Sequence, residues 1–225
     1  MSRILSIDTS TQACSCALAI NEDVYESFEV IPRQHAGMLL GMVDDLMREH
    51  NLHFKDLDAI AYGNGPGSFT GLRIAAGVVQ GIAYGADLPV IPVSTLACQA
   101  FQLLHTEADL AFSSLDARID EVYWGFYRLD DGGISLIGEE GLCKPELLPG
   151  TFPGTAEEVI CVGGGLVYLE RMPDIYRHPH LFRDDSICPR ASAIAQLAKP
   201  LLVKGHVQIA EAVNPVYLRD KVTHS

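Results

Sequence analysis

A pattern of three strands that occurs twice is the feature that most constrains the fold of this chain. Each copy opens with three predicted strands joined by short turns, and its first strand ends in an aspartate, Asp8 or Asp116. The predicted strands are residues 3–9, 14–20 and 24–30 in the first copy and 110–118, 121–127 and 134–138 in the second. Because helices and strands alternate after each meander, the order βββαβαβα followed by βββ(α)βα indicates an internal duplication.

Two such lobes characterise the actin-like, hexokinase-like ATPase architecture. We therefore predict an α/β, actin-like fold of duplicated βββαβα lobes, with an N-terminal lobe at residues 1–108 and a C-terminal lobe at 109–225. Residues 130–133 are the predicted hairpin turn of the second meander. An irregular, proline-bracketed stretch follows at residues 173–189, so we predict that the second lobe is reduced.

A glycine-rich stretch, residues 63–71, separates a predicted strand at 57–62 from a predicted helix at 74–85. Its four glycines allow the bare backbone to approach a neighbouring group, and Thr70 is a candidate N-cap for the helix. A strand-to-helix turn of this kind can form an anion or phosphate cradle. The stretch matches neither the P-loop nor the G-x-G-x-x-G pattern, so a purely structural turn remains the alternative.

In the actin-like architecture, an aspartate and small hydroxyls on the first hairpin of each lobe hold magnesium and phosphates. Asp116 and Arg118 take these places in the second lobe, and the glycines at 163–165 could contact an adenosine. We interpret the candidates as a weak or vestigial nucleotide site made of Asp8, Thr9, Ser10, Gly65, Gly67, Ser68, Gly163 and Gly164. A lone aspartate at a strand end is more often a turn residue, which is the competing interpretation.

Two predicted helices carry unusual faces. The helix at residues 34–49 has a methionine-rich apolar stripe, and the next helix carries Gly77, Gly81 and Gly85 at four-residue spacing. Each glycine in a helix interior costs about 0.5–1 kcal/mol relative to alanine. Three of them indicate that another helix approaches closely, and the sequence leaves open whether that helix belongs to this chain or to a partner.

The composition limits the chemistry. The net charge is −13, from 16 Lys and Arg against 29 Asp and Glu, so the chain lacks the clustered cations that grip RNA or DNA. No apolar run spans a membrane, the N-terminus does not resemble a signal peptide, and none of the six cysteines forms Cys-x-x-Cys, which favours a cytoplasmic location. No histidine pairs with a serine or cysteine at a recognisable spacing, and His178 and His180 lie in a stretch that reads as a loop. We predict no catalytic and no metal-ligating residues.

Four motifs in order resemble the bacterial TsaB family, which was formerly grouped with glycoprotease-like proteins. They are Ile4–Ser10, Gly65–Arg73, Asp116-Ala117-Arg118 with Glu121-Val122-Tyr123, and Pro215–Arg219. The resemblance implies an actin-like subunit that helps make threonylcarbamoyladenosine beside the anticodon of tRNA without carrying the chemistry. It further implies pairing with the catalytic relative TsaD, docking of the ATPase TsaE, a homodimer when alone, and contact with tRNA only through the partner. No cofactor of its own is implied, and ATP with magnesium would be bound only in the complex.

The catalytic relatives carry a His-x-x-x-His metal pair on the helix after the next strand. The corresponding positions here are Thr95 and Gln99, neither of which suits iron or zinc. The resemblance assigns the partner interface to the first two helices, with the candidates His35, Met38, Met42, Leu46, Arg73, Gly77, Gly81 and Gly85. The alternatives are an actin-fold ATPase or small-molecule kinase, and a peptidase suggested only by the older grouping.

Overall fold

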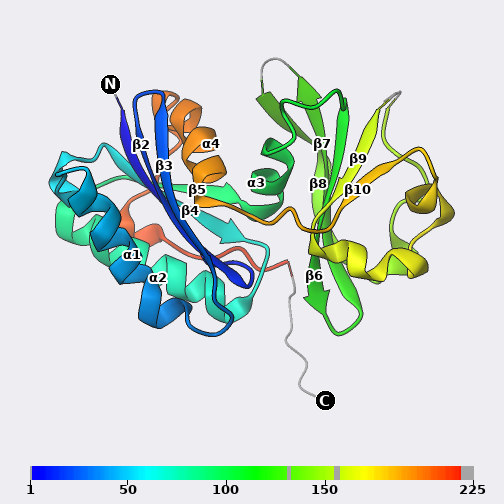
Figure 1. Cartoon of the computed structure of the whole chain (residues 1–225), viewed down its shortest axis with the longest axis horizontal. Helices are drawn as coiled ribbons and strands as arrows, with labels where there is room; N and C mark the ends of the chain where they lie inside the picture. The colour runs from blue at the N-terminus through cyan, green and yellow to red at the C-terminus, as the bar shows by residue number, and fades with distance from the viewer. Residues whose placement is uncertain (1, 131–132, 155–157, 219–225) are drawn as a thin grey trace. The chain divides into compact units, whose positions relative to one another are not determined.

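The computed structural model describes residues 2–130, 133–154 and 158–218, and its contacts divide the chain into two units (Figure 1). The first unit is built on a mixed five-stranded sheet in the order β3-β2-β1-β4-β5. Its strands are β1 (Arg3–Asp8), β2 (Ala13–Ile20), β3 (Asp23–Val30), β4 (Ala59–Gly65) and β5 (Val90–Ser94). β1 pairs antiparallel with β2 and parallel with β4, so the predicted first meander is confirmed.

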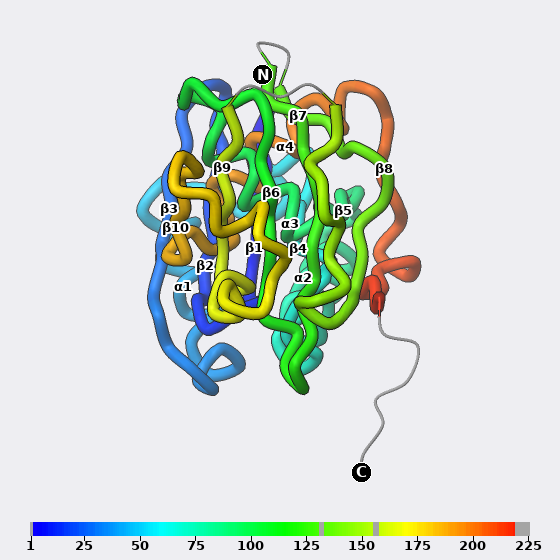
Figure 2. The backbone as a smooth tube through the Cα atoms, turned by 90° about the vertical axis from the view of Figure 1, so that its right-hand side faces the viewer, coloured from blue at the N-terminus to red at the C-terminus, as the bar shows by residue number. Residues whose placement is uncertain are grey.

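The second unit repeats this topology. Its sheet has the order β10-β9-β6-β7-β8, which Figure 2 shows from left to right. The strands are β6 (Leu110–Arg118), β7 (Glu121–Asp130), β8 (Gly133–Cys143), β9 (Val159–Val162) and β10 (Phe182–Asp184). β6 pairs antiparallel with β7 and parallel with β9, as β1 does with β2 and β4, so the predicted internal duplication is confirmed. The short strand β10 lies in the stretch that was predicted to be irregular.

Helices α1 (His35–Glu49) and α2 (Phe69–Ala86) cover one face of the first sheet (Figure 1). α1 forms because its apolar residues recur at three- and four-residue spacing, and this stripe enters the core with Leu39 and Val43 fully buried. α2 begins one residue before Thr70. Its N-cap is Ser68, whose hydroxyl accepts a hydrogen bond from the N–H of Gly71 at 3.3 Å, so the prediction of Thr70 as the cap was wrong.

Helix α4 (Ala191–Val203) packs against β1 and β2, although it lies far away in the sequence. The Ala191 N–H donates to the Ser15 hydroxyl at 3.0 Å, and the Ser6 hydroxyl donates to the Ala191 carbonyl at 2.7 Å. As a result, the first unit contains the residues up to Cys98 together with Pro189–Val216, and most of the second unit is Gln99–Cys188. This division differs from the predicted one at residue 108, because these polar contacts attach the returning chain to the first sheet.

The second unit has short 3-10 segments at the positions where the first unit has long helices. Where α1 and α2 occur in the first unit, it has the short 3-10 segments η2 (Pro145–Leu147) and η3 (Gly164–Arg171). Its core is aromatic, with the Phe112 and Tyr176 rings 4.7 Å apart and the Phe112 and Phe126 rings 5.4 Å apart. The prediction of a reduced second lobe is confirmed. The remaining helical segments are α3 (Thr95–Phe101), η1 (Phe54–Asp56), η4 (Asp174–Arg177) and η5 (Ala210–Ala212).

Within the described ranges, no helix is both long enough and apolar enough to cross a membrane. Asp131 and Gly132 of the predicted hairpin turn, and Arg219 of the last motif, lie outside those ranges.

Candidate functional site

The turn after β1 and the glycine-rich stretch after β4 pack directly on each other. The Ser68 N–H donates to the Ser10 carbonyl at 2.7 Å, and the Thr9 hydroxyl donates to the Gly71 carbonyl at 2.7 Å. Asp8, Thr9 and Ser10 are all buried. The structure therefore brings together the first-unit candidates that the sequence placed in one site.

The glycines of this stretch serve the close approach of one backbone to another. A Cβ on Gly67 would lie 2.6 Å from the Ser10 carbonyl oxygen, and a Cβ on Gly71 would overlap the carbonyl oxygen of Thr9. On the other side, a Cβ on Gly65 would lie 2.6 Å from the Val216 carbonyl oxygen. These positions require glycine because a side chain there would collide with the neighbouring backbone.

The Asp8 carboxylate is enclosed in the same way. Its Oδ1 accepts hydrogen bonds from the N–H and the hydroxyl of Ser10, at 3.0 and 2.8 Å, whereas its buried Oδ2 has no hydrogen-bond partner among the described residues. A Cβ on Gly63 would overlap Oδ2, and the Thr95 methyl group lies beside the same point. Burial raises the pKa of Asp8 to about 6, and the hydrogen bonds from Ser10 oppose this shift. The Asp8 carboxylate is thus enclosed within its own unit.

Replacing Asp8 by asparagine is expected to stabilise the chain at pH 8 and to have little effect near pH 4. The folded-state pKa of about 6 lies above the ordinary aspartate pKa of 3.8, so wild-type stability is lost as the pH rises through this window. At pH 8 the ionised carboxylate costs on the order of 3 kcal/mol, and asparagine removes that cost while keeping an oxygen for Ser10. Urea unfolding of both proteins at pH 4 and pH 8 measures the difference. Equal destabilisation by the substitution at both pH values would contradict this description of Asp8.

The glycine triplet of the second unit also packs on its own sheet. A Cβ on Gly163 would overlap the Ser114 carbonyl oxygen, and a Cβ on Gly165 would lie 2.6 Å from the Ser114 Cβ, whereas Gly164 is open. Asp116 Oδ1 accepts hydrogen bonds from the Arg118 N–H at 2.7 Å and the Tyr168 hydroxyl at 2.9 Å. Gly163 and Gly165 thus pack against Ser114, a role that was not predicted when the triplet was interpreted as an adenosine contact.

Thr95 and Gln99, the two positions that the resemblance aligned with a metal pair, are buried and hydrogen-bonded. The Thr95 hydroxyl donates to the Pro66 carbonyl. The Gln99 amide donates to the Ile187 carbonyl at 2.7 Å, and its oxygen accepts from the Ser113 hydroxyl at 3.1 Å. Both side chains are fully buried, and the described ranges hold no group of three or more His, Cys, Asp or Glu residues that could bind a metal.

The glycine stripe of α2 lies on the exposed side of the helix. Gly77, Gly81 and Gly85 are exposed, and a Cβ on any of them would have no neighbouring atom within 4 Å. Arg73 continues the stripe by one helical step, with its guanidinium 3.9 Å from the centre of the Phe69 ring. The helix that the stripe would accommodate is therefore not supplied by the described part of this chain.

The candidates on α1 divide between the surface and the core. Met38 is exposed, but Met42 and Leu46 are buried in the hydrophobic core, which corrects their assignment to an exposed interface. His35 is also buried, with Nε2 3.2 Å from the Ala13 carbonyl oxygen. These residues are buried because the apolar stripe of α1 packs on the sheet of the first unit.

Two glycines on α1 were missed at the sequence level. Gly37 and Gly41 are exposed, and a Cβ on either would have no neighbour within 4 Å. Their four-residue spacing is the same signal that identified the stripe on α2. Together with Gly77, Gly81 and Gly85 they form what we call the glycine face of α1 and α2.

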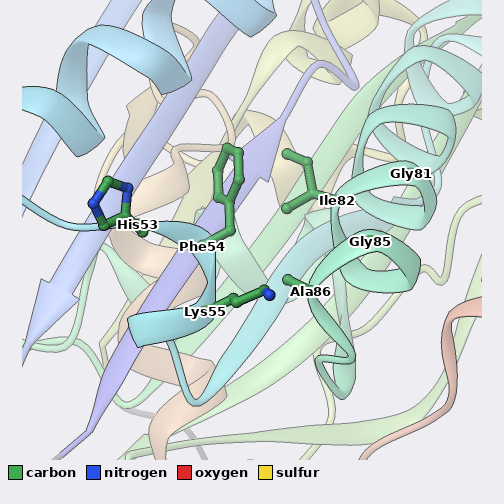
Figure 3. A pocket seen from close by; sticks show the side chains of 7 residues that line it. All are labelled: His53, Phe54, Lys55, Gly81, Ile82, Gly85 and Ala86. Atoms are coloured by element: carbon green, nitrogen blue, oxygen red, sulfur yellow. The ribbon is translucent and has the colours of Figure 1, made fainter.

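A shallow hollow adjoins the glycine face. Figure 3 shows Phe54 and Ile82 on its two sides, with Lys55 directed toward the end of α2. The lining residues are His53, Phe54 and Lys55 beside η1, and Gly81, Ile82, Gly85 and Ala86 on α2. The glycine face is thus continuous with an apolar recess that carries one cationic group.

Comparison with known proteins identifies the family. A family model described as TsaD, tRNA N6-adenosine threonylcarbamoyltransferase, matches residues 27–173. The protein named tRNA threonylcarbamoyladenosine biosynthesis protein TsaB from Escherichia coli K12 is 39% identical over 98% of this chain and 96% of its own length. The chain belongs to the TsaB family. The TsaB protein of Haemophilus influenzae is 35% identical over 98% of this chain and 94% of its own length.

A solved structure of a TsaB relative has the same fold. The structure described as YeaZ from Pseudomonas aeruginosa superposes with a TM-score of 0.90 at 43% identity, covering 97% of this chain and all of that one. The two repeated sheets and this match confirm the predicted α/β, actin-like fold.

Proposed function

We propose that this TsaB-family chain is a non-catalytic scaffold subunit in the synthesis of threonylcarbamoyladenosine in tRNA. It pairs with a TsaD-type catalytic subunit, and a TsaE-type ATPase joins the pair. The observation that carries this proposal is the glycine face. A Cβ added to any of its five helical glycines would have no described residue of the chain within 4 Å. Retaining them costs helix stability, and close packing of a partner's helices accounts for that cost.

The non-catalytic role is supported by the state of the polar residues that a catalyst would need, which are buried or already hydrogen-bonded. Asp8 is fully buried beneath the glycine-rich stretch, and Thr95 and Gln99 are engaged in hydrogen bonds to the backbone or to Ser113. The Thr95 and Gln99 side chains are thus already hydrogen-bonded within their own units. We therefore assign the chain no cofactor of its own, and ATP with magnesium binds in the complex, outside these residues.

The net charge of the chain and its glycine face indicate which partners it binds in the tRNA-modifying assembly. Its net charge of −13 disfavours direct binding to tRNA, so a more basic partner contacts the tRNA. When the chain is alone, the glycine face pairs with that of a second copy, and the TsaD-type subunit replaces the copy in the complex. Because its substrate is tRNA, the assembly works in the cytoplasm.

A reconstitution experiment tests this function. Purified TsaD-type and TsaE-type proteins are incubated with tRNA and the small-molecule substrates, with and without this chain, and the modified adenosine is quantified by mass spectrometry. We expect modification to require the chain, and the chain alone to produce none. The Asp8→Asn variant is expected to support at least half of the wild-type rate. A loss of 100-fold or more with Asp8→Asn would instead favour the actin-fold ATPase or kinase.

A further inference from the structure

A pocket of about 550 Å³ lies in the second unit, between the start of β9 and the segment that joins η4 to β10. Apolar and polar residues both line it. The apolar ones are Phe152, Val159, Ile175 and Leu181, and the polar ones are Glu158, His178 and His180. We call it the His178 pocket. Its volume falls within the range of about 300–1,000 Å³ that is typical of small-molecule sites.

The segment that carries the two histidines is held by backbone hydrogen bonds. The Leu181 N–H donates to the His178 carbonyl at 3.1 Å, and the Arg183 guanidinium donates to the same carbonyl at 3.0 Å. The same guanidinium also donates to the Tyr176 carbonyl at 3.1 Å, which ties the segment to η4. The imidazole rings of His178 and His180 lie with their centres 5.3 Å apart. Both rings therefore project from one hydrogen-bonded turn.

Glu158 and Phe152 are also fixed by their neighbours. The Glu158 carbonyl accepts hydrogen bonds from the N–H groups of Asp109 and Leu110, at 2.9 and 3.2 Å. The Glu158 N–H donates to the Asp109 carboxylate at 3.3 Å. The Phe152 ring packs edge-on against the Tyr176 ring, with the centres 5.2 Å apart. Residues from both sides of the pocket are thus ordered before a ligand binds, which lowers the free-energy cost of binding.

The polar side chains of the pocket are not used within the chain. Glu158, His178 and His180 are exposed, and their side chains form no hydrogen bond or ion pair with another described residue. An ionised carboxylate only accepts hydrogen bonds, whereas a neutral imidazole has one donor and one acceptor. A ligand that covers these groups must supply partners for them, because a polar group buried without a partner costs free energy. A purely apolar ligand is therefore disfavoured.

We propose that the His178 pocket binds a free, uncharged nitrogen heterocycle that carries an amino group, such as the base of adenosine. The amino group donates to the Glu158 carboxylate, a ring nitrogen accepts from an imidazole N–H, and the planar ring lies against Phe152 and Leu181. Nucleotides and nucleic acids are disfavoured, because their phosphates are repelled by Glu158 and by the net charge of −13. The pocket belongs to the second unit, so this inference does not depend on the glycine face or on the proposed function.

The test follows the amide signals of the full, isotope-labelled chain by NMR during titration with adenosine and with purine riboside, which lacks the amino group. We expect adenosine to shift the amides of Val159 and of residues 175–181, and to bind at least about tenfold more tightly than purine riboside. Glu158→Ala should abolish this preference, whereas Glu158→Gln, which keeps an acceptor oxygen, should retain part of it. Glu139→Ala is the matched control, because Glu139 is exposed on β8 and does not line the pocket, and it should change neither affinity.

Three results would overturn the inference. The first is the absence of shifts at the pocket amides up to the solubility limit of adenosine. The second is equal affinity of the wild type for adenosine and purine riboside, or a preference that Glu158→Ala leaves intact, because Glu158 would then not receive an amino group. The third is tenfold tighter binding of adenosine monophosphate than of adenosine, because the pocket would then recognise a phosphate. None of these measurements involves the glycine face, so the proposed function is tested separately.

Discussion

Replacing Gly71 by alanine is expected to lower the free energy of unfolding by about 3 kcal/mol, the upper part of the usual range for overpacking. The new Cβ would overlap the carbonyl oxygen of Thr9, and both the helix start and the turn after β1 are fixed by further hydrogen bonds. Because the obstacle is backbone and not the end of a flexible side chain, it cannot move away locally. Urea unfolding followed by circular dichroism measures the change.

Gly77→Ala is the matched control, since Gly77 lies on the same helix with no neighbour within 4 Å. There alanine should raise the stability of the isolated chain by about 0.5–1 kcal/mol through helix propensity alone. Equal effects of the two substitutions would mean that the glycine-rich stretch does not pack on the turn as described.

Replacing Gly81 by glutamine is expected to weaken binding of the TsaD-type subunit by 100-fold or more while leaving the isolated chain folded. Glutamine is a good helix former, and no atom of the described residues lies within 4 Å of the new Cβ. At a helix–helix contact, however, its side chain would separate the two backbones that glycine allows to meet. Binding is measured by calorimetry, and the same variant should shift the chain from dimer to monomer in sedimentation equilibrium.

Gly150→Gln is the control for this experiment, because Gly150 is also exposed, has ordinary backbone angles and has open space around its Cβ position. It should leave binding unchanged. Undiminished binding of Gly81→Gln would exclude the glycine face as the interface.

The sequence predicted the fold well because its signals are local and repeated. Two meanders that each end their first strand in aspartate predicted two sheets of the same topology, and the proline-broken stretch predicted a reduced second unit. The position of α4 could not be predicted, because it depends on hydrogen bonds that join Ser6 and Ser15 to Ala191, more than 170 positions away. Pattern and spacing carry no information about such contacts.

The site was predicted less completely, for physical reasons that differ between residues. A glycine-rich turn looks the same in sequence whether it encloses a phosphate or a neighbouring backbone, so only the structure shows that Ser10 fills the space beside Gly67. The methionine stripe of α1 was assigned to an interface, yet Met42 is core and Met38 is exposed, because helical spacing identifies a face without saying what covers it.

Hydrogen–deuterium exchange of this chain, alone and mixed with the TsaD-type subunit, tests the central claim most directly. If the chain is a scaffold that binds through its glycine face, the amides of His35–Glu49 and Phe69–Ala86 should exchange more slowly in the mixture, whereas those of α4 should not change. Unchanged exchange in both α1 and α2, in a mixture shown by native mass spectrometry to contain the complex, would contradict the account.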